Sequence, residues 1–455
     1  MSQLYASLFY QAEITQIFSD EGVVSYMLQT EAALAQAQAK LGVIPAVAAE
    51  YIIAVAQRPV IEVIDFAALA NAAGLAGNIA IPLVKQFTAA VKKVDEDASR
   101  YVHWGATSQD IIDTACILQC RDALNIIEKQ LLEAIQATQL LTEQYRDQVM
   151  IGRTWLQQGL PLTFGYKTAR WLSSLQRDLE RIQAVKAFAL TAQLGGAVGT
   201  LASLLDQGSV VVEAFAKELE LNVPDCTWHG ERDRIVEIAH VLATLTGNLG
   251  KMARDWSLMM QTEIAEVFEP SGVGRGGSST MPHKRNPVAA ASILAAANRV
   301  PDLMSSMYQS LVQEHERSLG AWHAEWLALP EIFQLCSGSL ARAIEVFNGL
   351  EVQVENMHRN LECTQGLIMA EALMMALAPK LGRLNAHHLV EAACKQAVAE
   401  QRHLLDVAQQ NADIMAIFDA QQLQEIFNPQ HYLGNTQQQI DAVLQRVQGK
   451  TPSCH

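Results

Sequence analysis

The chain has 455 residues, half of them hydrophobic and 18% charged, with 26 glycines and 13 prolines. This composition excludes a disordered, collagen-like or low-complexity protein. The formal net charge is −15 at pH 7, so the surface as a whole repels nucleic acid and anionic membranes, and we expect neither as a partner. An anionic small molecule would bind only in a locally positive pocket.

The cysteines and the N-terminal segment indicate a compartment. The seven cysteines are scattered without a CxxC pair, and this odd number predicts free thiols rather than disulfides or a metal site. The first residues lack a basic stretch followed by an apolar core, so no secretory signal is predicted. Two uncharged windows, 66–84 and 187–205, are rich in alanine and glycine, which suits a packed interior better than a lipid-facing span. Together these features predict a cytoplasmic protein.

Helix patterns dominate the chain, and strand patterns are nearly absent. Within 234–266, eight apolar residues from Ile235 to Met259 alternate steps of three and four, the spacing of a helix packed in a bundle. Because one domain cannot easily bury several helices of such length, we expect subunits to associate through a long-helix bundle. In chain order, the long helices are predicted over 111–147, 163–192, 234–266, 288–313 and 329–358.

Proline and glycine divide the chain into three predicted domains. An N-terminal helical domain is expected over 1–110, a central long-helix bundle domain over 111–362, and a C-terminal helical domain over 363–455. The division depends on the distribution of helix breakers, because the sequence contains no long flexible linker and no repeat of solenoid period.

Four short polar segments between the predicted helices are candidates for function. Residues 103–114 place Thr107 and Asp110 at capping-box spacing before a helix, where hydroxyls and N-terminal amides also form an anion site. Residues 152–158 are either a functional turn or an interhelical turn with Trp155 in the core. Close helix packing alone could explain 193–200, and an exposed charged helix end could explain 315–318.

The strongest local feature is the loop 272–287, GVGRGGSSTMPHKRNP. Its glycines allow close approach to a ligand, and a lysine, an arginine and two serines follow them. Such a loop could close over a carboxylate together with the N-terminus of the next helix, with Asn286 as N-cap and Pro287 at N1. The GxGxxG spacing within it follows a helix rather than a strand, so a dinucleotide site is not expected.

The segment 277–286, GSSTMPHKRN, resembles the signature loop of the fumarase/aspartase superfamily, GSSxMPxKxN. The other four segments resemble the remaining blocks of that superfamily in the same order. The resemblance implies an all-α, three-domain helical fold whose central long-helix bundle is shared in a homotetramer. It also implies active sites assembled from three subunits, no cofactor and no metal, and reversible β-elimination next to a carboxylate.

One position distinguishes two branches of this superfamily. The loop end MPHKRNP and the segment HERS resemble the adenylosuccinate lyase side, whose turn motif resembles GRTHxQ with a histidine that protonates the leaving group. This chain has Trp155 there. An amine leaves only with help from an acid, whereas a carboxylate needs none because its conjugate acid has a pKa of about 4.

The segments GRTWLQ, AGNxxIPLV and HERSxGAWHAEW resemble instead the lactone-forming, cycloisomerase branch. This resemblance implies that one carboxylate of a small-molecule tricarboxylate substrate adds across a double bond. It assigns proton transfer to Ser278 and carboxylate binding to Lys284, the two expected catalytic residues. The expected substrate-binding residues are His103, Thr107, Ser108, Thr154, Trp155, Gln157, Ser279, Met281, Asn286 and Arg317.

Two alternatives remain open from the sequence. The chain could be an adenylosuccinate lyase-like or other amine lyase whose acid has moved to His229, His315 or His323. It could also be a non-catalytic helical scaffold, although a protein freed from catalysis has no reason to keep Ser278 and Lys284.

Overall fold

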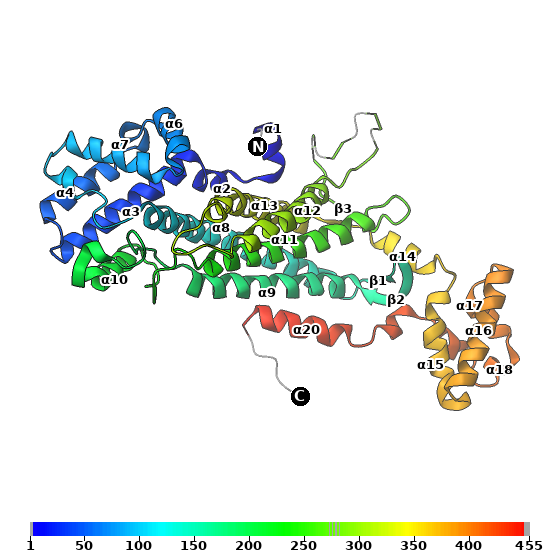
Figure 1. Cartoon of the computed structure of the whole chain (residues 1–455). Helices are drawn as coiled ribbons and strands as arrows, with labels where there is room; N and C mark the ends of the chain where they lie inside the picture. The colour runs from blue at the N-terminus through cyan, green and yellow to red at the C-terminus, as the bar shows by residue number, and fades with distance from the viewer. Residues whose placement is uncertain (1–2, 273, 275, 278–279, 282, 450–455) are drawn as a thin grey trace. The chain divides into compact units, whose positions relative to one another are not determined.

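The computed structural model describes residues 3–272, 274, 276–277, 280–281 and 283–449 (Figure 1). Within these residues the fold is helical with two small antiparallel sheets, which agrees with the predicted all-α class. The chain divides into two compact units. The first unit contains 1–132, 178–250 and 292–342, and the second contains 133–177, 251–291 and 343–455.

Five long helices match the predicted ones with two corrections. They are α8 (Ser108–Gln144), α9 (Phe164–Ala189), α11 (Asp233–Met259), α12 (Val288–Gln309) and α13 (Ala321–Gly349). The third ends seven residues before the predicted 266. The fifth begins eight residues before the predicted 329 and continues through Pro330, because burial of its face outweighs the hydrogen bond that proline removes. The remainder of the range 329–358 contains a break and a further short helix.

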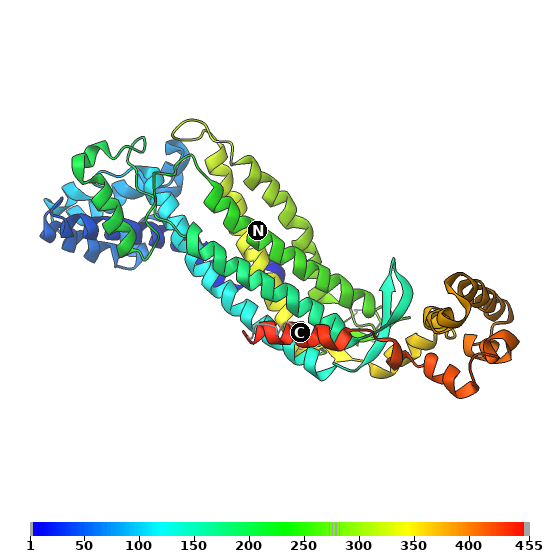
Figure 2. The same cartoon turned by 90° about the horizontal axis from the view of Figure 1, so that it is seen from below.

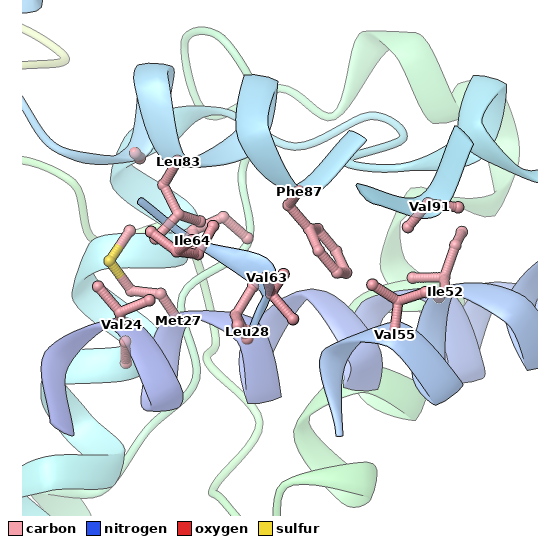
Figure 3. Packing of buried hydrophobic residues seen from close by; sticks show 14 of the residues in the cluster. Val24, Met27, Leu28, Ile52, Val55, Val63, Ile64, Leu83, Phe87 and Val91 are labelled. Carbon is pink, nitrogen blue, oxygen red and sulfur yellow. The ribbon is translucent and has the colours of Figure 1, made fainter. Parts of the chain in front are cut away.

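The first unit has a helical core built from short elements at the N-terminal end of the chain. Met27, Phe87 and Val91 are among its fully buried side chains (Figure 3). Phe87 and Val91 lie one turn apart on the same helix, so this helix buries one continuous face. The other elements of the unit are α1 (Gln3–Phe9), α2 (Ala12–Ile17), α3 (Asp20–Lys40), α4 (Ala46–Ala56), α5 (Val60–Val63), α6 (Phe66–Ala76), α7 (Ala80–Lys92), η1 (Ala98–Tyr101), η2 (Ala202–Gln207) and α10 (Gly208–Glu218). Of these, α3 is a helix of 21 residues that was not predicted as a long helix.

Parts of the five long helices pack together within the first unit. Asp178 of α9 accepts two hydrogen bonds from the side-chain amide of Asn248 of α11, at 3.0 and 2.8 Å. Ser337 of α13 donates to Gln130 of α8 at 2.9 Å. A Cβ at Gly250 of α11 would lie only 2.6 Å from the side chain of Ala297 of α12, so glycine permits this close helix contact.

The second unit contains both sheets. Strands β1 (Val149–Thr154) and β2 (Gln157–Thr163) form a hairpin, the teal arrows of Figure 2. Strands β3 (Val267–Phe268) and β4 (Glu351–Val352) pair in antiparallel register. These strands were not predicted, because the sequence offers no run of alternating apolar residues with an Asn-Gly or Asp-Gly turn.

The C-terminal helices of the second unit enclose a separate core. Its fully buried members include Leu373, Leu377 and Ile414. Among the described residues, no single helix combines the length and apolar composition needed to cross a membrane; only a pair bent by 76°, Val354–Glu362 with Leu367–Leu381, meets that test together. The elements are α14 (Val354–Glu362), η3 (Leu367–Met369), α15 (Ala370–Leu381), α16 (Arg383–Glu400), α17 (Leu404–Gln410), α18 (Ala412–Met415), α19 (Ala420–Ile426), η4 (Pro429–Tyr432) and α20 (Thr436–Val447).

Candidate active site

Three of the predicted polar segments converge at the start of α8 in the first unit. Arg317 donates from Nε to the side-chain oxygen of Gln109 at 2.9 Å, and from a terminal nitrogen to Thr107 Oγ1 at 3.3 Å. The same guanidinium donates to the main-chain oxygen of Ala197 at 3.2 Å. Arg317 therefore links segments 103–114, 193–200 and 315–318, which lie far apart along the chain.

Asp110 holds two of these segments from the buried side. Its carboxylate, 0% exposed, accepts from the main-chain N–H groups of Gly195 and Gly196, each at 2.9 Å. It also accepts from the N–H of Thr107 at 2.9 Å and contacts Nε2 of His229 at 2.7 Å. The capping box predicted here is thus half formed, since Thr107 Oγ1 accepts from Arg317 while Asp110 binds the Thr107 amide.

His103 contributes positive charge close to this turn. It has a positive φ of 60°, and its Nδ1 lies 2.6 Å from the buried Glu31 carboxylate. Burial lowers the pKa of His103, but the charge and hydrogen bond of Glu31 outweigh it, and the net pKa is raised. The exposed Arg317 guanidinium, with His103 nearby, favours an anionic ligand beside Thr107 and Ser108.

A buried ion triad braces the helix that carries this turn. Arg232, 2% exposed, donates bidentately to Asp113 at 2.7 and 3.0 Å and also to Glu325 at 2.7 Å. Trp322 adds a hydrogen bond to Asp113 at 2.9 Å. Burial raises the pKa of Glu325, partly offset by Arg232. Asp113 lies one turn after Gln109, so the triad fixes α8 directly behind the candidate anion site.

The GRTWLQ segment is a β-hairpin and not an interhelical turn. Trp155 and Leu156 form its two-residue tip with positive φ values of 53° and 63°, as a type I′ turn requires. Trp155 is 95% exposed in the chain, so the alternative of a core tryptophan is wrong. Thr154 pairs with Gln157 across the turn, and both are exposed. Trp and Leu rarely adopt the positive φ values that this turn requires, so the backbone of the tip is strained. Strain of this kind is often found at functional positions.

The hairpin is fixed by an ion pair close to its tip. Arg153 donates to both oxygens of the buried Glu266 at 2.9 and 2.7 Å. Asn360 donates to the same carboxylate at 2.9 Å. Since Glu266 immediately precedes β3, these contacts connect the hairpin to the strand that leads into the signature loop.

The described part of the signature loop borders a cavity of about 330 Å³ in the second unit. Lys284 and Asn286 line it together with loop glycines. Asn286 donates its main-chain N–H to the oxygen of Gly276 at 2.9 Å, and a Cβ at Gly276 would lie 2.8 Å from the Asn286 oxygen. Met281 is half-exposed, and its oxygen accepts from the Lys284 N–H at 3.0 Å. The predicted Ser278 and Ser279 lie outside the described residues.

The helix after the loop begins in a different way from that predicted. The N–H groups of Ala289 and Ala290 both donate to Glu269, each at 2.9 Å, and this carboxylate is 4% exposed. Asn286 is therefore not the N-cap, because Glu269 accepts the first free amides of α12. The negative carboxylate also occupies the positive end of the helix, so that end is not open to a substrate carboxylate.

Arg285 anchors the loop to β4. It donates to both oxygens of Glu351 at 2.7 and 2.8 Å and to the Glu269 main-chain oxygen at 2.7 Å. These hydrogen bonds hold the pKa of Glu351 well below its ordinary value, at about 2. Arg285 thus has a structural role, although it lines the cavity together with its neighbour Lys284.

The predicted residues therefore fall into two groups. His103, Thr107, Ser108 and Arg317 lie together in the first unit. Thr154, Trp155, Gln157, Met281, Lys284 and Asn286 lie in the second. Sequence reasoning missed the supporting carboxylates Glu31, Asp110 and Glu269 as site residues, because their partners are distant in sequence; only Asp110 carried a signal, its capping spacing to Thr107.

Comparisons with known proteins agree with this arrangement of motifs. The lyase family matches residues 10–301, and the family described as adenylosuccinate lyase C-terminus matches residues 366–443. The chain is 69% identical over 450 residues to a 3-carboxy-cis,cis-muconate cycloisomerase of Acinetobacter baylyi, covering 99% of this chain and 100% of that protein.

Two solved structures are also similar. The β-carboxy-cis,cis-muconate cycloisomerase of Acinetobacter calcoaceticus has a TM-score of 0.93 and 67% identity, covering 98% of this chain and 100% of that one. The 3-carboxy-cis,cis-muconate lactonizing enzyme of Pseudomonas putida has a TM-score of 0.94 and 45% identity, covering 98% and 99%.

Proposed function

Because the chain belongs to the lyase family of the fumarase/aspartase superfamily, we propose that it is a cycloisomerase that converts 3-carboxy-cis,cis-muconate to 4-carboxymuconolactone. This reaction is a step of protocatechuate degradation. The observation that carries the proposal is similarity over the whole chain to cycloisomerases and a lactonizing enzyme. Trp155, at the position where amine-eliminating relatives have an acid, supports it independently.

The reaction proceeds by addition of one substrate carboxylate across a double bond. Ser278 delivers a proton to the carbon next to a second carboxylate, and in the reverse direction it removes that proton. Lys284 and Asn286 hold this second carboxylate as negative charge spreads over it, which is the type of preorganised stabilisation that removes several kcal/mol from a barrier. The carboxylate nucleophile needs no base, because it is ionised at neutral pH.

The remaining carboxylate groups of the tricarboxylate bind at the other segments. Thr107, Ser108 and the cationic pair His103 and Arg317 favour one anionic group. Thr154, Gln157, Ser279 and Met281 complete the binding set, and the Trp155 ring fills the space that a general acid takes in amine lyases. The charge and hydrogen bond of Glu31 outweigh burial and raise the pKa of His103.

We further infer a cytoplasmic homotetramer in which each active site receives segments from three subunits. The exposed hairpin tip supports this assembly, since Trp155 and Leu156 are 95% and 77% exposed in the single chain. So does the open groove of about 770 Å³ between α11 and α12, lined by His240, Met304 and Tyr308. Free cysteines throughout the described residues support a reducing compartment.

The amine-lyase alternative requires a histidine that can protonate the leaving group, and two of its three candidates are held by other contacts. His229 is 2% exposed and contacts Asp110, and His323 contacts the Gly77 oxygen through Nε2 at 3.0 Å. Neither arrangement presents an acid to a ligand. Trp155→His should nevertheless be made, because gain of activity on adenylosuccinate would identify position 155 as the determinant of the leaving group.

The first test is incubation of the purified protein with 3-carboxy-cis,cis-muconate while the ultraviolet absorbance of the diene is followed. Loss of absorbance with a lactone as product is expected, and Ser278→Ala should slow turnover by at least about 10²-fold. Mixed tetramers of Ser278→Ala and Arg317→Ala, each inactive alone, should regain activity if sites are shared between subunits. A folded protein without turnover would refute the substrate assignment.

A further inference from the structure

A surface cluster on α16 has the donors of a metal site. His387, His388 and Glu391 are all exposed, and one ligand atom of each lies within 4.8 Å of the other two. We propose that these three side chains bind a divalent ion of the zinc class on the surface of the C-terminal helices. The proposal is independent of the catalytic function.

Helical spacing brings the three donors to one place. His387 and Glu391 are four residues apart and His388 and Glu391 are three apart, so both imidazoles lie one turn before the same carboxylate. Nδ1 of His388 is 3.9 Å from Oε2 of Glu391. Donors around tetrahedral zinc lie about 3.4 Å apart, as follows from bonds of about 2.1 Å. Small rotations of exposed side chains therefore complete the site.

The donor set selects the kind of ion. Two neutral imidazoles and one carboxylate suit zinc, nickel or copper, whereas calcium and magnesium prefer oxygen ligands only. The remaining positions of the ion would be filled by water. On the same unit, His431 and Glu425 also make a pair, with Nδ1 and Oε2 3.0 Å apart. Among the described residues, only the α16 cluster brings three such donors together.

Lys395 competes for the same carboxylate. Its Nζ lies 2.7 Å from Oε1 of Glu391, while His388 faces Oε2. A bound ion would therefore use Oε2, with the ammonium group one oxygen away. Since like charges at this separation repel, removal of Lys395 should strengthen ion binding, a result that a merely structural role of the cluster would not produce.

The experiment is calorimetric titration of the tag-free, full-length protein with zinc chloride in a weakly coordinating buffer. The wild type should bind one more ion per chain than His388→Gln or Glu391→Gln. His431→Gln, a matched loss of an exposed histidine beside a carboxylate, should bind as the wild type does. Lys395→Gln should bind at least threefold more tightly.

The outcomes separate a built site from scattered surface binding. Equal stoichiometry in the wild type and His388→Gln would overturn the proposal, as would an equal loss in His431→Gln. Weaker binding by Lys395→Gln would contradict the assigned role of Glu391. Turnover of the cycloisomerase reaction should be the same in all variants, because none of these residues belongs to the candidate active site.

Discussion

Replacement of Asp110 by asparagine tests whether a buried carboxylate holds segments 103–114 and 193–200 of the candidate site together. The carboxylate makes four contacts of 2.7 to 2.9 Å with Thr107, Gly195, Gly196 and His229. Asparagine keeps one acceptor oxygen and places an NH₂ donor where the other oxygen was, so two buried N–H donors lose their acceptor. Each such loss costs about 1–3 kcal/mol, which gives about 2–6 kcal/mol for Asp110→Asn.

The same substitution should impair function beyond its effect on stability. Displacement of the Thr107 turn by even 1 Å can cost about 10²-fold in kcat/KM. The assays are urea unfolding followed by circular dichroism and steady-state turnover of 3-carboxy-cis,cis-muconate. Both are to be compared with the wild type under identical salt and pH.

Asp178→Asn is the matched control. Asp178 is also a buried carboxylate of the first unit, 1% exposed, and it binds Arg181 at 2.7 Å and Asn248 at 2.8 Å. Loss of the Asp178 carboxylate should lower stability without a comparable loss of kcat/KM, because its partners Arg181 and Asn248 are not among the predicted site residues. If Asp110→Asn lowers kcat/KM no more than this control, or destabilises by less than about 1 kcal/mol, the bracing role of Asp110 is wrong.

Three further predictions concern the supporting carboxylates. Glu269→Ala should lower the free energy of unfolding by about 3 kcal/mol or more, because two amides of α12 and an indole N–H lose their acceptor; an unchanged urea midpoint would contradict this. Arg232→Met should destabilise by about 3–5 kcal/mol, since two buried carboxylates lose their partner, and Arg232→Lys should rescue little because lysine cannot donate bidentately to both. The lowered pKa of Glu351, about 2 against an ordinary 4.5, means that its contribution to stability is complete above pH 4.5 and is lost as the pH falls toward 2. The stability difference between the wild type and Glu351→Gln should therefore shrink over that range, and a difference that grows on acidification would refute the assigned Arg285 contact.

Local patterns in the sequence were enough for the long helices. The three-and-four spacing from Ile235 to Met259 predicted α11, which begins one residue before the expected start. Where a helix boundary in the structure differs from the predicted one, tertiary packing outweighs the local sequence pattern. The last long helix continues through Pro330, where its neighbours Leu329 and Phe333 are buried. The predicted three-domain division remains a prediction.

The hairpin shows why local patterns fail at functional positions. Its tip is Trp155-Leu156 rather than Asn-Gly, so the turn carries no hairpin signal. Strand propensity describes residues that stabilise strands and turns, whereas this tip lacks the favoured pair. The hairpin is held instead by the ion pair of Arg153 and Glu266 close to the tip. Rules that describe stability therefore give no signal for this hairpin.

By itself, the sequence determined the helical class, the positions of the long helices, the motif segments and the chemistry expected of them. Each of these depends on residues close together in the chain, where spacing alone decides which side chains share a face or a turn. Only the tertiary structure decided which carboxylates support those segments. Asp110 accepts a hydrogen bond from Gly195, and Glu31 contacts His103. Glu269 rather than Asn286 accepts the first amides of α12. Such contacts join residues that are distant in sequence. The packing of the helices decides which residues become partners, and no local sequence pattern encodes that packing.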